Sequence, residues 1–170
     1  MRLYGLVGKA RAGKDTLVSI VQDNTDEVVV RHAFADALKD EVAAALGCSA
    51  NHIENHKEVF RPILQWWGTE WRRAADADHW IKRLAARLPW SHDVVVFIPD
   101  VRFDNEATFI RRLGGQILRV IREDGVTTPH TDHVTETGLT AQIEQARFYN
   151  RTLPEFEEQV KAWWATQKPT

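Results

Sequence analysis

The stretch that most constrains this chain lies at its beginning, where a short apolar run leads into a glycine-bounded loop and then into a helical pattern. The apolar run covers residues 2–7, the loop extends from Gly8 to Gly13-Lys14, and helical spacing of apolar residues starts at Leu17. Glycines let successive backbone N–H groups point into one concavity, and the start of the next helix adds donors and partial positive charge. This order predicts a phosphate-binding loop, in which Lys14 would reach the outer phosphates of a nucleoside triphosphate.

The loop departs from the usual phosphate-binding motif at one position. Asp15 follows the lysine where a serine or threonine usually holds Mg²⁺, and the hydroxyl comes one residue later, at Thr16. A tight turn that carries a surface lysine would explain the same residues without any ligand. The place of the loop between a strand and a helix favours the phosphate-binding interpretation.

The rest of the chain alternates strands with helices. Further strands are expected at 28–30, 93–98, 116–121 and 146–149, and helices at 13–22, 34–46, 105–113 and 153–165. This alternation predicts an α/β three-layer sandwich of about five parallel strands. A single domain over 1–170 would then contain a helical insertion at 50–90, between strands two and three, and a lid-like polar loop at 122–138.

The insertion is rich in tryptophan and carries several helix-boundary signals. Four of the seven tryptophans lie within fifteen residues of each other, namely Trp66, Trp67, Trp71 and Trp80. Most of them are expected to form core. A helix should begin at Pro62 and break at Gly68, with Thr69 as the N-cap of the next turn, and Asp78 should cap a helix that Pro89 stops.

Composition and charge exclude several classes of protein. A chain of 170 residues with a net charge of −2 has no overall basic field that would attract nucleic acid. The single cysteine, Cys48, excludes an intramolecular disulfide and a cysteine-based zinc site. No apolar stretch approaches the roughly 20 residues of a membrane span, and the short apolar start is no signal peptide. We therefore expect a cytoplasmic protein without nucleic-acid or membrane partners.

Polar residues follow the other expected strands at the edge where the loop should lie. Asp36 follows strand two, Asp100 and Arg102 follow strand three, and Arg122 ends strand four. Parallel sheets bind ligands beyond the carboxyl ends of their strands, and phosphoryl transfer needs carboxylates for Mg²⁺ and arginines for phosphate. Two plainer interpretations stay open: Asp36 could cap its helix, and Asp100 and Arg102 could form a structural ion pair.

An ordered set of short motifs makes the chain resemble the bacteriophage deoxynucleoside monophosphate kinase family. The motifs are, in chain order, Gly8-x4-Gly13-Lys14-Asp15-Thr16, Phe34-Ala35-Asp36-x-Leu38-Lys39, Gln65-x-x-Gly68-Thr69-Glu70, Asp78-x-Trp80, Asp100-x-Arg102-x-x-Asn105-Glu106 and Asp132-His133-x-Thr135-Glu136. The resemblance covers nearly the whole chain, and it implies the strand order 2-3-1-4-5 of nucleotide kinases. Its implications for the activity and for the site residues are expectations based on similarity.

The resemblance implies transfer of the γ-phosphoryl group of ATP to a deoxynucleoside monophosphate, with Mg²⁺ as cofactor and ATP as co-substrate. It implies catalytic roles for Lys14, Arg102, Arg122 and Asp15, and an ATP-binding set of Gly8, Arg11, Gly13, Lys14, Asp15, Thr16 and Arg122. The implied acceptor-binding residues are Lys9, Asp36, Lys39, Arg61, Gln65, Gly68, Thr69, Glu70, Arg72, Trp80, Asp100, Arg102, Glu106, His133 and Glu136. Mg²⁺ would be held by Asp15, Thr16 and Asp100. The resemblance also favours a homodimer, in the host cytoplasm if the protein is encoded by a phage.

Two other functions share parts of this pattern. Another small kinase with a phosphate-binding loop, acting on dephospho-coenzyme A or on a nucleoside, would have the same loop and fold. A module that hydrolyses ATP to drive a partner would have the loop but no need of a second pocket, and the helical insertion counts against it. Metal sites built on His130, Asp132 and His133, or on His52 and His56, are disfavoured because the further ligands that zinc needs are missing.

Overall fold

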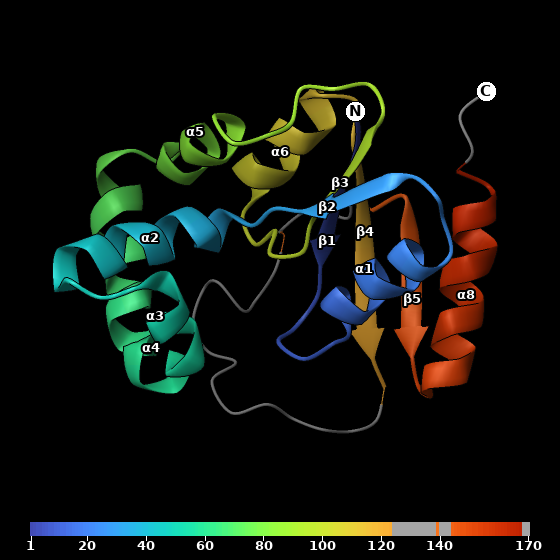
Figure 1. Ribbon diagram of the computed structural model, residues 1–170, viewed down its shortest axis with the longest axis horizontal. Helices are drawn as coiled ribbons and strands as arrows, with labels where there is room; N and C mark the ends of the chain where they lie inside the picture. The colour runs from blue at the N-terminus through green and yellow to red at the C-terminus, as the bar shows by residue number, and fades with distance from the viewer. Residues whose placement is uncertain (124–138, 140–143, 168–170) are drawn as a thin grey trace. The chain divides into compact units, whose positions relative to one another are not determined.

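The structure is a computed structural model that describes residues 1–123, 139 and 144–167. Its chain divides into two compact units, of which unit 1 comprises Met1–Arg31 and Pro89–Thr170 and unit 2 comprises His32–Leu88 (Figure 1). Unit 2 includes most of the predicted insertion but begins earlier, at His32. The organisation as one kinase domain over 1–170 stays a prediction.

Unit 1 contains a five-stranded parallel sheet formed by β1 (Arg2–Val7), β2 (Val28–Arg31), β3 (Val94–Ile98), β4 (Gln116–Arg122) and β5 (Ala146–Asn150). The strand order is β2-β3-β1-β4-β5, which confirms the predicted topology. β1 lies at the centre, where Gly5 is paired with Ile98 of β3 and with Ile117 of β4. β1 and β3 are apolar almost throughout, as strands that are covered on both faces require.

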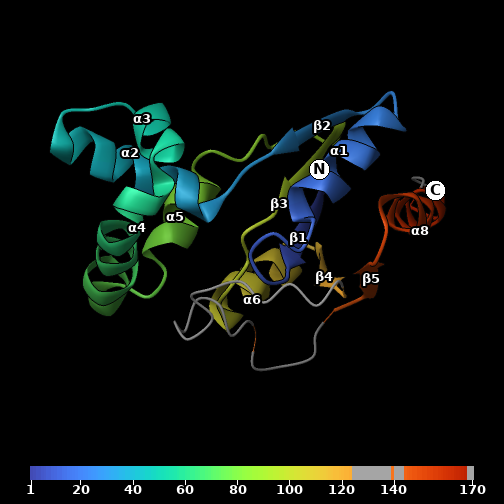
Figure 2. The same ribbon diagram turned by 90° about the horizontal axis from the view of Figure 1, so that it is seen from below.

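Three helices cover the two faces of this sheet: α1 (Lys14–Asp23), α6 (Asp104–Arg112) and α8 (Leu153–Ala165). α1 and α8 share one face, where Leu17 and Phe156 are fully buried in a common core. α6 packs on the other face, and Figure 2 shows it across the strands from α1. Gly5 makes room for α6, because a Cβ there would come within 2.6 Å of the Ile110 side chain.

Unit 2 is helical and consists of α2 (Phe34–Leu46), α3 (Ala50–Asn55), α4 (Lys57–Gln65), the π-helix η1 (Trp66–Arg73) and α5 (His79–Ala85). Its core is formed by Val42, Ala43 and Ile53, against which Phe60 and Trp67 pack. α2 ends at Gly47, whose φ of 67° is the left-handed conformation typical of a C-terminal glycine. Within the described residues of both units, no helix is long and apolar enough to cross a membrane.

Two predicted helix boundaries in unit 2 are wrong. Pro62 lies inside α4, and the chain continues from α4 through Gly68 into η1 without a break. Packing outweighs the low helix propensity of glycine here. Gly68 is buried where a Cβ would come 3.0 Å from Cδ2 of Leu38, and its carbonyl accepts a hydrogen bond from Trp80 Nε1 at 3.0 Å. Thr69 therefore lies inside a π-helix and is not an N-cap.

Candidate nucleotide-binding site

The loop between β1 and α1 bends at two positions that favour glycine. Gly8 has φ 152° and Gly13 has φ 108°, and Arg11 between them adopts the left-handed value of 60°. The space is equally restrictive. A Cβ on Gly8 would come 2.3 Å from the carbonyl oxygen of Val120, and one on Gly13 would come 2.5 Å from Nδ2 of Asn150. The loop thus depends on both glycines for its conformation and for its close contact with β4 and β5.

Lys14 lies across this loop. Its Nζ donates hydrogen bonds to the carbonyl oxygens of Gly8 and Lys9, at 2.7 and 2.8 Å. α1 begins at Lys14 with Gly13 as its N-cap, and a glycine has no side chain that could accept from the N–H groups of the first turn. The loop thus combines an ammonium group with a helix N-terminus, which is an arrangement suited to an anion such as a phosphate.

Side chains at the ends of β4 and β5 hold the loop by its carbonyl groups. Arg122 Nη1 donates to the carbonyl oxygen of Arg11 at 3.1 Å, and Asn150 Nδ2 donates to that of Ala12 at 2.9 Å. The strand-end argument places Arg122 beside the loop, and the structure brings the two together. Sequence reasoning missed Asn150, because asparagine after an apolar strand is also an ordinary turn residue.

A buried carboxylate, that of Glu106, fixes the backbone of the segment after β3 that carries Arg102. Glu106 Oε2 accepts hydrogen bonds from the N–H groups of Arg102 at 2.8 Å and Phe103 at 3.1 Å, and Glu106 is only 2% exposed. Arg102 is exposed and Asp100 is half-buried. The resemblance implies that Glu106 binds the acceptor, whereas these contacts are to the backbone that carries Arg102.

The expected magnesium ligands include one strongly exposed side chain. The Asp15 side chain is 78% exposed, and its Oδ1 lies 3.2 Å from Nε of Arg31 at the end of β2. Thr16 and Asp100 are half-buried. No group of three histidine, cysteine or acidic side chains among the described residues could hold a metal by itself. Hydroxyl and carboxylate oxygens nevertheless suit Mg²⁺, which commonly takes one or two protein ligands beside phosphate oxygens.

In unit 2, two expected acceptor residues lie at the start of α2. Asp36 Oδ2 accepts a hydrogen bond from the N–H of Ala33 at 3.0 Å, so Asp36 does cap its helix. Lys39 Nζ donates to Asp36 Oδ1 at 3.3 Å and to Glu54 Oε2 at 2.8 Å. The hydrogen bond from Lys39 is the main reason why the pKa of the Glu54 carboxyl is lowered to about 2.

A carboxylate that no sequence pattern singles out, Glu41 of α2, joins cationic and aromatic side chains of η1 and α5. Its Oε1 accepts hydrogen bonds from Trp67 Nε1, at 3.0 Å, and from Arg72. Its Oε2 lies 3.4 Å from His79 Nε2 and 4.0 Å from Arg83 Nη2. Burial raises the pKa of the Glu41 carboxyl, but the hydrogen bonds from Trp67, Arg72 and His79 outweigh burial and leave the pKa below its ordinary value.

The tryptophans of unit 2 are not placed as expected. Trp80 is 3% exposed, so the structure gives its ring no open face on which a base could stack. Trp66 and Trp71 are instead 53% and 40% exposed, and their rings are stacked with centroids 5.7 Å apart. The guanidinium of Arg72 lies 4.3 Å from the centroid of the Trp71 ring. The exposed aromatic surface of this unit therefore belongs to η1 and not to α5.

The remaining expected residues occupy varied places. Arg61 pairs with Glu58 on α4, with Nη2 and Oε1 3.1 Å apart. Gln65 ends α4, Thr69 and Glu70 lie in η1, and the Lys9 side chain is exposed in unit 1. His133 and Glu136, with most of the lid-like loop at 122–138, lie outside the described residues.

Comparisons with known proteins point to one family. A family model described as deoxynucleotide monophosphate kinase matches residues 44–160. A protein of Acanthamoeba polyphaga mimivirus, named as a candidate deoxynucleotide monophosphate kinase, is 29% identical over 189 aligned positions that cover 94% of each chain. Among solved structures, a candidate kinase from Chloroflexus aurantiacus has a TM-score of 0.52 at 17% identity, covering 97% of this chain and 94% of that one. Shikimate kinase from Aquifex aeolicus has a TM-score of 0.47 at 15% identity, covering 98% and 97%. At these identities the structural likeness concerns the fold alone.

Proposed function

This chain belongs to the deoxynucleotide monophosphate kinase family, and from that premise we propose that it transfers the γ-phosphoryl group of ATP to a deoxynucleoside 5′-monophosphate. The products would be the deoxynucleoside diphosphate and ADP. The observation that carries the proposal is the position of Lys14 across a loop whose shape depends on Gly8 and Gly13. The family model matches from residue 44 onward, so the loop supports the proposal independently.

We assign the phosphates of ATP to the loop and to the side chains around it. Lys14, Arg11 and Arg122 supply positive charge, and the N–H groups at the start of α1 supply donors. The transferred phosphoryl group spreads negative charge over its oxygens, and fixed cations at that place lower the barrier. Bound with ATP, Mg²⁺ would neutralise further charge, and Thr16, Asp100 and Asp15 are the oxygen donors that we assign to it.

We assign recognition of the acceptor to cationic side chains. In unit 1 we assign this role to Arg102, whose backbone N–H is hydrogen-bonded to Glu106. Its guanidinium suits a phosphate monoester, because a guanidinium can bind phosphate through two parallel hydrogen bonds. In unit 2 the corresponding residues are Lys39, Arg61 and Arg72. The acceptor phosphate is already an oxyanion, so the reaction needs positioning and charge neutralisation rather than a strong general base.

The proposal is tested by the dependence of ADP release on the acceptor. ADP release from ATP is measured in a coupled assay with no acceptor, with each deoxynucleoside monophosphate, with dephospho-coenzyme A and with a nucleoside. We expect turnover that requires a deoxynucleoside monophosphate. Turnover with one of the other acceptors would identify a different kinase, and ADP release that no acceptor changes would identify an ATP-hydrolysing module.

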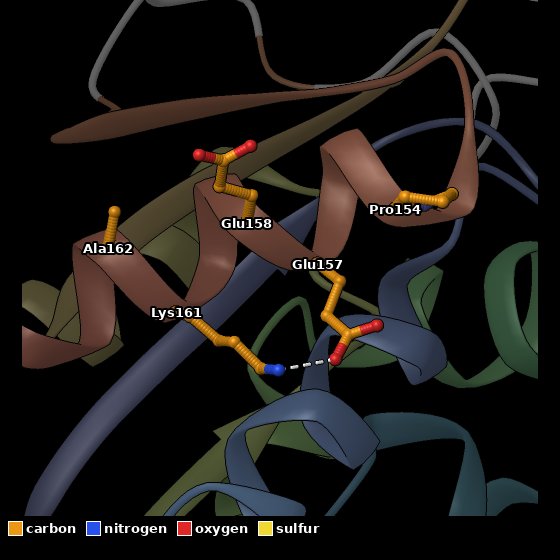
Figure 3. A pocket seen from close by; sticks show the side chains of 5 residues that line it. All are labelled: Pro154, Glu157, Glu158, Lys161 and Ala162. Carbon is orange, nitrogen blue, oxygen red and sulfur yellow. Dashed lines mark ion pairs between the residues drawn. The ribbon is translucent and has the colours of Figure 1, made fainter.

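The assignment of Lys14 is tested by Lys14→Ala. Loss of a fixed cation at the reacting phosphates should lower kcat by a factor on the order of 10² to 10³. The matched control is Lys161→Ala, which removes a lysine that pairs with Glu157 at 2.5 Å in a shallow hollow on the outer face of α8 (Figure 3). Circular dichroism checks that both variants are folded. A folded Lys14→Ala enzyme with kcat within threefold of the parent would contradict the assignment.

A further inference from the structure

Unit 2 holds a carboxylate that is surrounded by more positive charge than it can neutralise. Glu41 is the one acidic partner of Arg72 and Arg83 among the ion pairs of the described residues, and His79 lies against its second oxygen. The Glu41 side chain is 14% exposed, whereas those of Arg72 and Arg83 are 33% and 51% exposed. The negative charge is therefore inside the cluster and the surplus positive charge faces solvent, where it can attract an anion.

Arg72 is held on two sides within this cluster. Its Nε and Nη2 both face Glu41 Oε1, and its guanidinium plane lies over the ring of Trp71. Trp71 is in turn stacked on Trp66. A guanidinium is planar and has five N–H donors in a fixed fork, so engaging one edge determines where the other donors point.

The orientation of the Glu41 carboxylate is itself fixed by its contacts with other side chains. Trp67 Nε1 donates to the same oxygen, Oε1, at 3.0 Å, and the Trp67 ring packs against the core of unit 2. His79 Nε2 lies 3.4 Å from Oε2. Oε1 thus has partners from η1, and Oε2 has partners from α5. The packing of unit 2 therefore sets the orientation of Glu41.

We propose that Glu41 is a positioning residue that holds Arg72 in the orientation in which its remaining N–H groups bind the phosphate of the acceptor nucleotide. The inference rests on the proposed function and names the device by which unit 2 binds its substrate. Removing the carboxylate would let the Arg72 side chain adopt other rotamers. Binding of the phosphate would then have to restrict Arg72 to one rotamer, which costs conformational entropy. The cost would therefore appear in acceptor binding rather than in the chemical step.

The test compares Glu41→Gln with Asp40→Asn. Glu41→Gln keeps the shape and an acceptor for Trp67 but removes the charge. We expect KM for the deoxynucleoside monophosphate to rise about tenfold, the scale of one charge-assisted hydrogen bond, while KM for ATP and kcat change less than about twofold. Asp40 is the neighbour of Glu41 on α2 and pairs with Arg87 at 2.9 Å, so Asp40→Asn removes a comparable ion pair and should leave both KM values unchanged.

A double-mutant cycle with Arg72→Lys separates positioning from a structural role. If Glu41 acts through Arg72, Glu41→Gln should raise KM for the acceptor no further once Arg72 is a lysine. Glu41→Asp keeps the charge with a shorter reach, so it should raise KM for the acceptor above that of the parent but less than Glu41→Gln does. If Glu41→Gln does not fold, the cycle uses Glu41→Asp instead. A lower melting temperature with unchanged acceptor KM, or fully additive effects in the double variant, would overturn the inference. A parent enzyme without acceptor-dependent turnover would instead overturn the proposed function, and the inference with it.

Discussion

At the scale of single residues, Asn150 shows how one amide supports the phosphate-binding loop. Its side-chain Nδ2 donates to the carbonyl oxygen of Ala12, and its backbone carbonyl oxygen accepts a hydrogen bond from the N–H of Glu123 at 3.3 Å. The amide fills the space into which a Cβ on Gly13 would project. Asn150 thereby connects the end of β5 both to the loop and to the residue that comes after β4.

We predict that Asn150→Ala raises KM for ATP severalfold and leaves KM for the acceptor unchanged. The physical reason is that the Ala12 carbonyl loses its partner, a loss of about 1 kcal/mol in the free energy of unfolding, and the loop loses one of its supports. Steady-state kinetics with each substrate varied in turn measures the two KM values. Asn24→Ala is the control, because Asn24 Nδ2 makes a similar bond to the Ile20 carbonyl, at 2.7 Å, at the other end of α1. Equal effects of the two variants on KM for ATP would show that Asn150 only stabilises the fold.

At the scale of elements, α2 and α3 are joined by a charged pair with a defined pH dependence. The folded-state pKa of Glu54 is about 2, against an ordinary value of 4.5, chiefly because Lys39 donates a hydrogen bond to it. A carboxyl whose pKa is lowered by folding stabilises the folded state above its ordinary pKa, and this contribution disappears as the pH falls toward the folded value. The stabilisation from Glu54 should therefore be complete at neutral pH and decline between about pH 4.5 and 2.

We predict that Glu54→Gln lowers the melting temperature at pH 7 and that the difference from the parent shrinks as the pH is lowered through this range. Thermal unfolding followed by circular dichroism at a series of pH values measures the difference. Lys39→Met removes the other half of the pair and should reduce the same pH-dependent difference. A gap between parent and Glu54→Gln that stays constant from pH 7 to pH 3 would contradict the assigned cause of the low pKa.

The elements also show how far sequence patterns could predict the fold. The strands of unit 1 are mostly runs of apolar and β-branched residues, and the Gly13-Lys14 junction is a local signal, so the positions of the strands and of the loop could be predicted. The order of the strands in the sheet was implied by the family resemblance. Pro62 and Gly68 misled the prediction of helix boundaries. Contacts with Leu38 and Trp80 decide the conformation at Gly68. Local propensity is a weak guide where such packing acts.

The same limit explains the residues that were missed in the candidate site. The partners of Glu41 lie 26, 31 and 38 residues further along the chain, so no local spacing marks this carboxylate. Trp80 was expected to contact the substrate because its motif resembles that of an acceptor pocket, and only the packing of unit 2 shows that its side chain is buried. Glu106 had a detectable signal, since an acidic residue at the third position of a helix often accepts hydrogen bonds from the backbone that precedes it.

At the scale of the whole molecule, the order of elements along the chain differs from their order in space. Unit 2 is one continuous segment, His32–Leu88, and its helices contact one another within that segment. Unit 1 is assembled from two segments, and its central strand β1 has as neighbours β3 and β4, both of which come after unit 2 in the sequence. Pairing β1 with β3 therefore requires closure of a longer loop than any helix contact inside unit 2 requires, and the longer loop costs more entropy.

We predict that amide protons of α2 and α5 become protected during refolding before those of β1 and β3. Pulse-labelled hydrogen exchange measures the order of protection. Earlier protection of β1 and β3 would contradict the argument from loop closure.

Because β4 and β5 support the loop, the protein can become able to bind ATP only at a certain stage of its synthesis. The loop sequence at 8–16 is synthesised before Val120, against which Gly8 packs, and before Asn150, which holds the Ala12 carbonyl. Until β5 has been made, a growing polypeptide would thus carry the complete phosphate-binding motif without the neighbours that give it shape. Affinity for ATP should therefore appear only after β4 and β5 have been made, and a chain that still lacks them should not withdraw nucleotide from the cell.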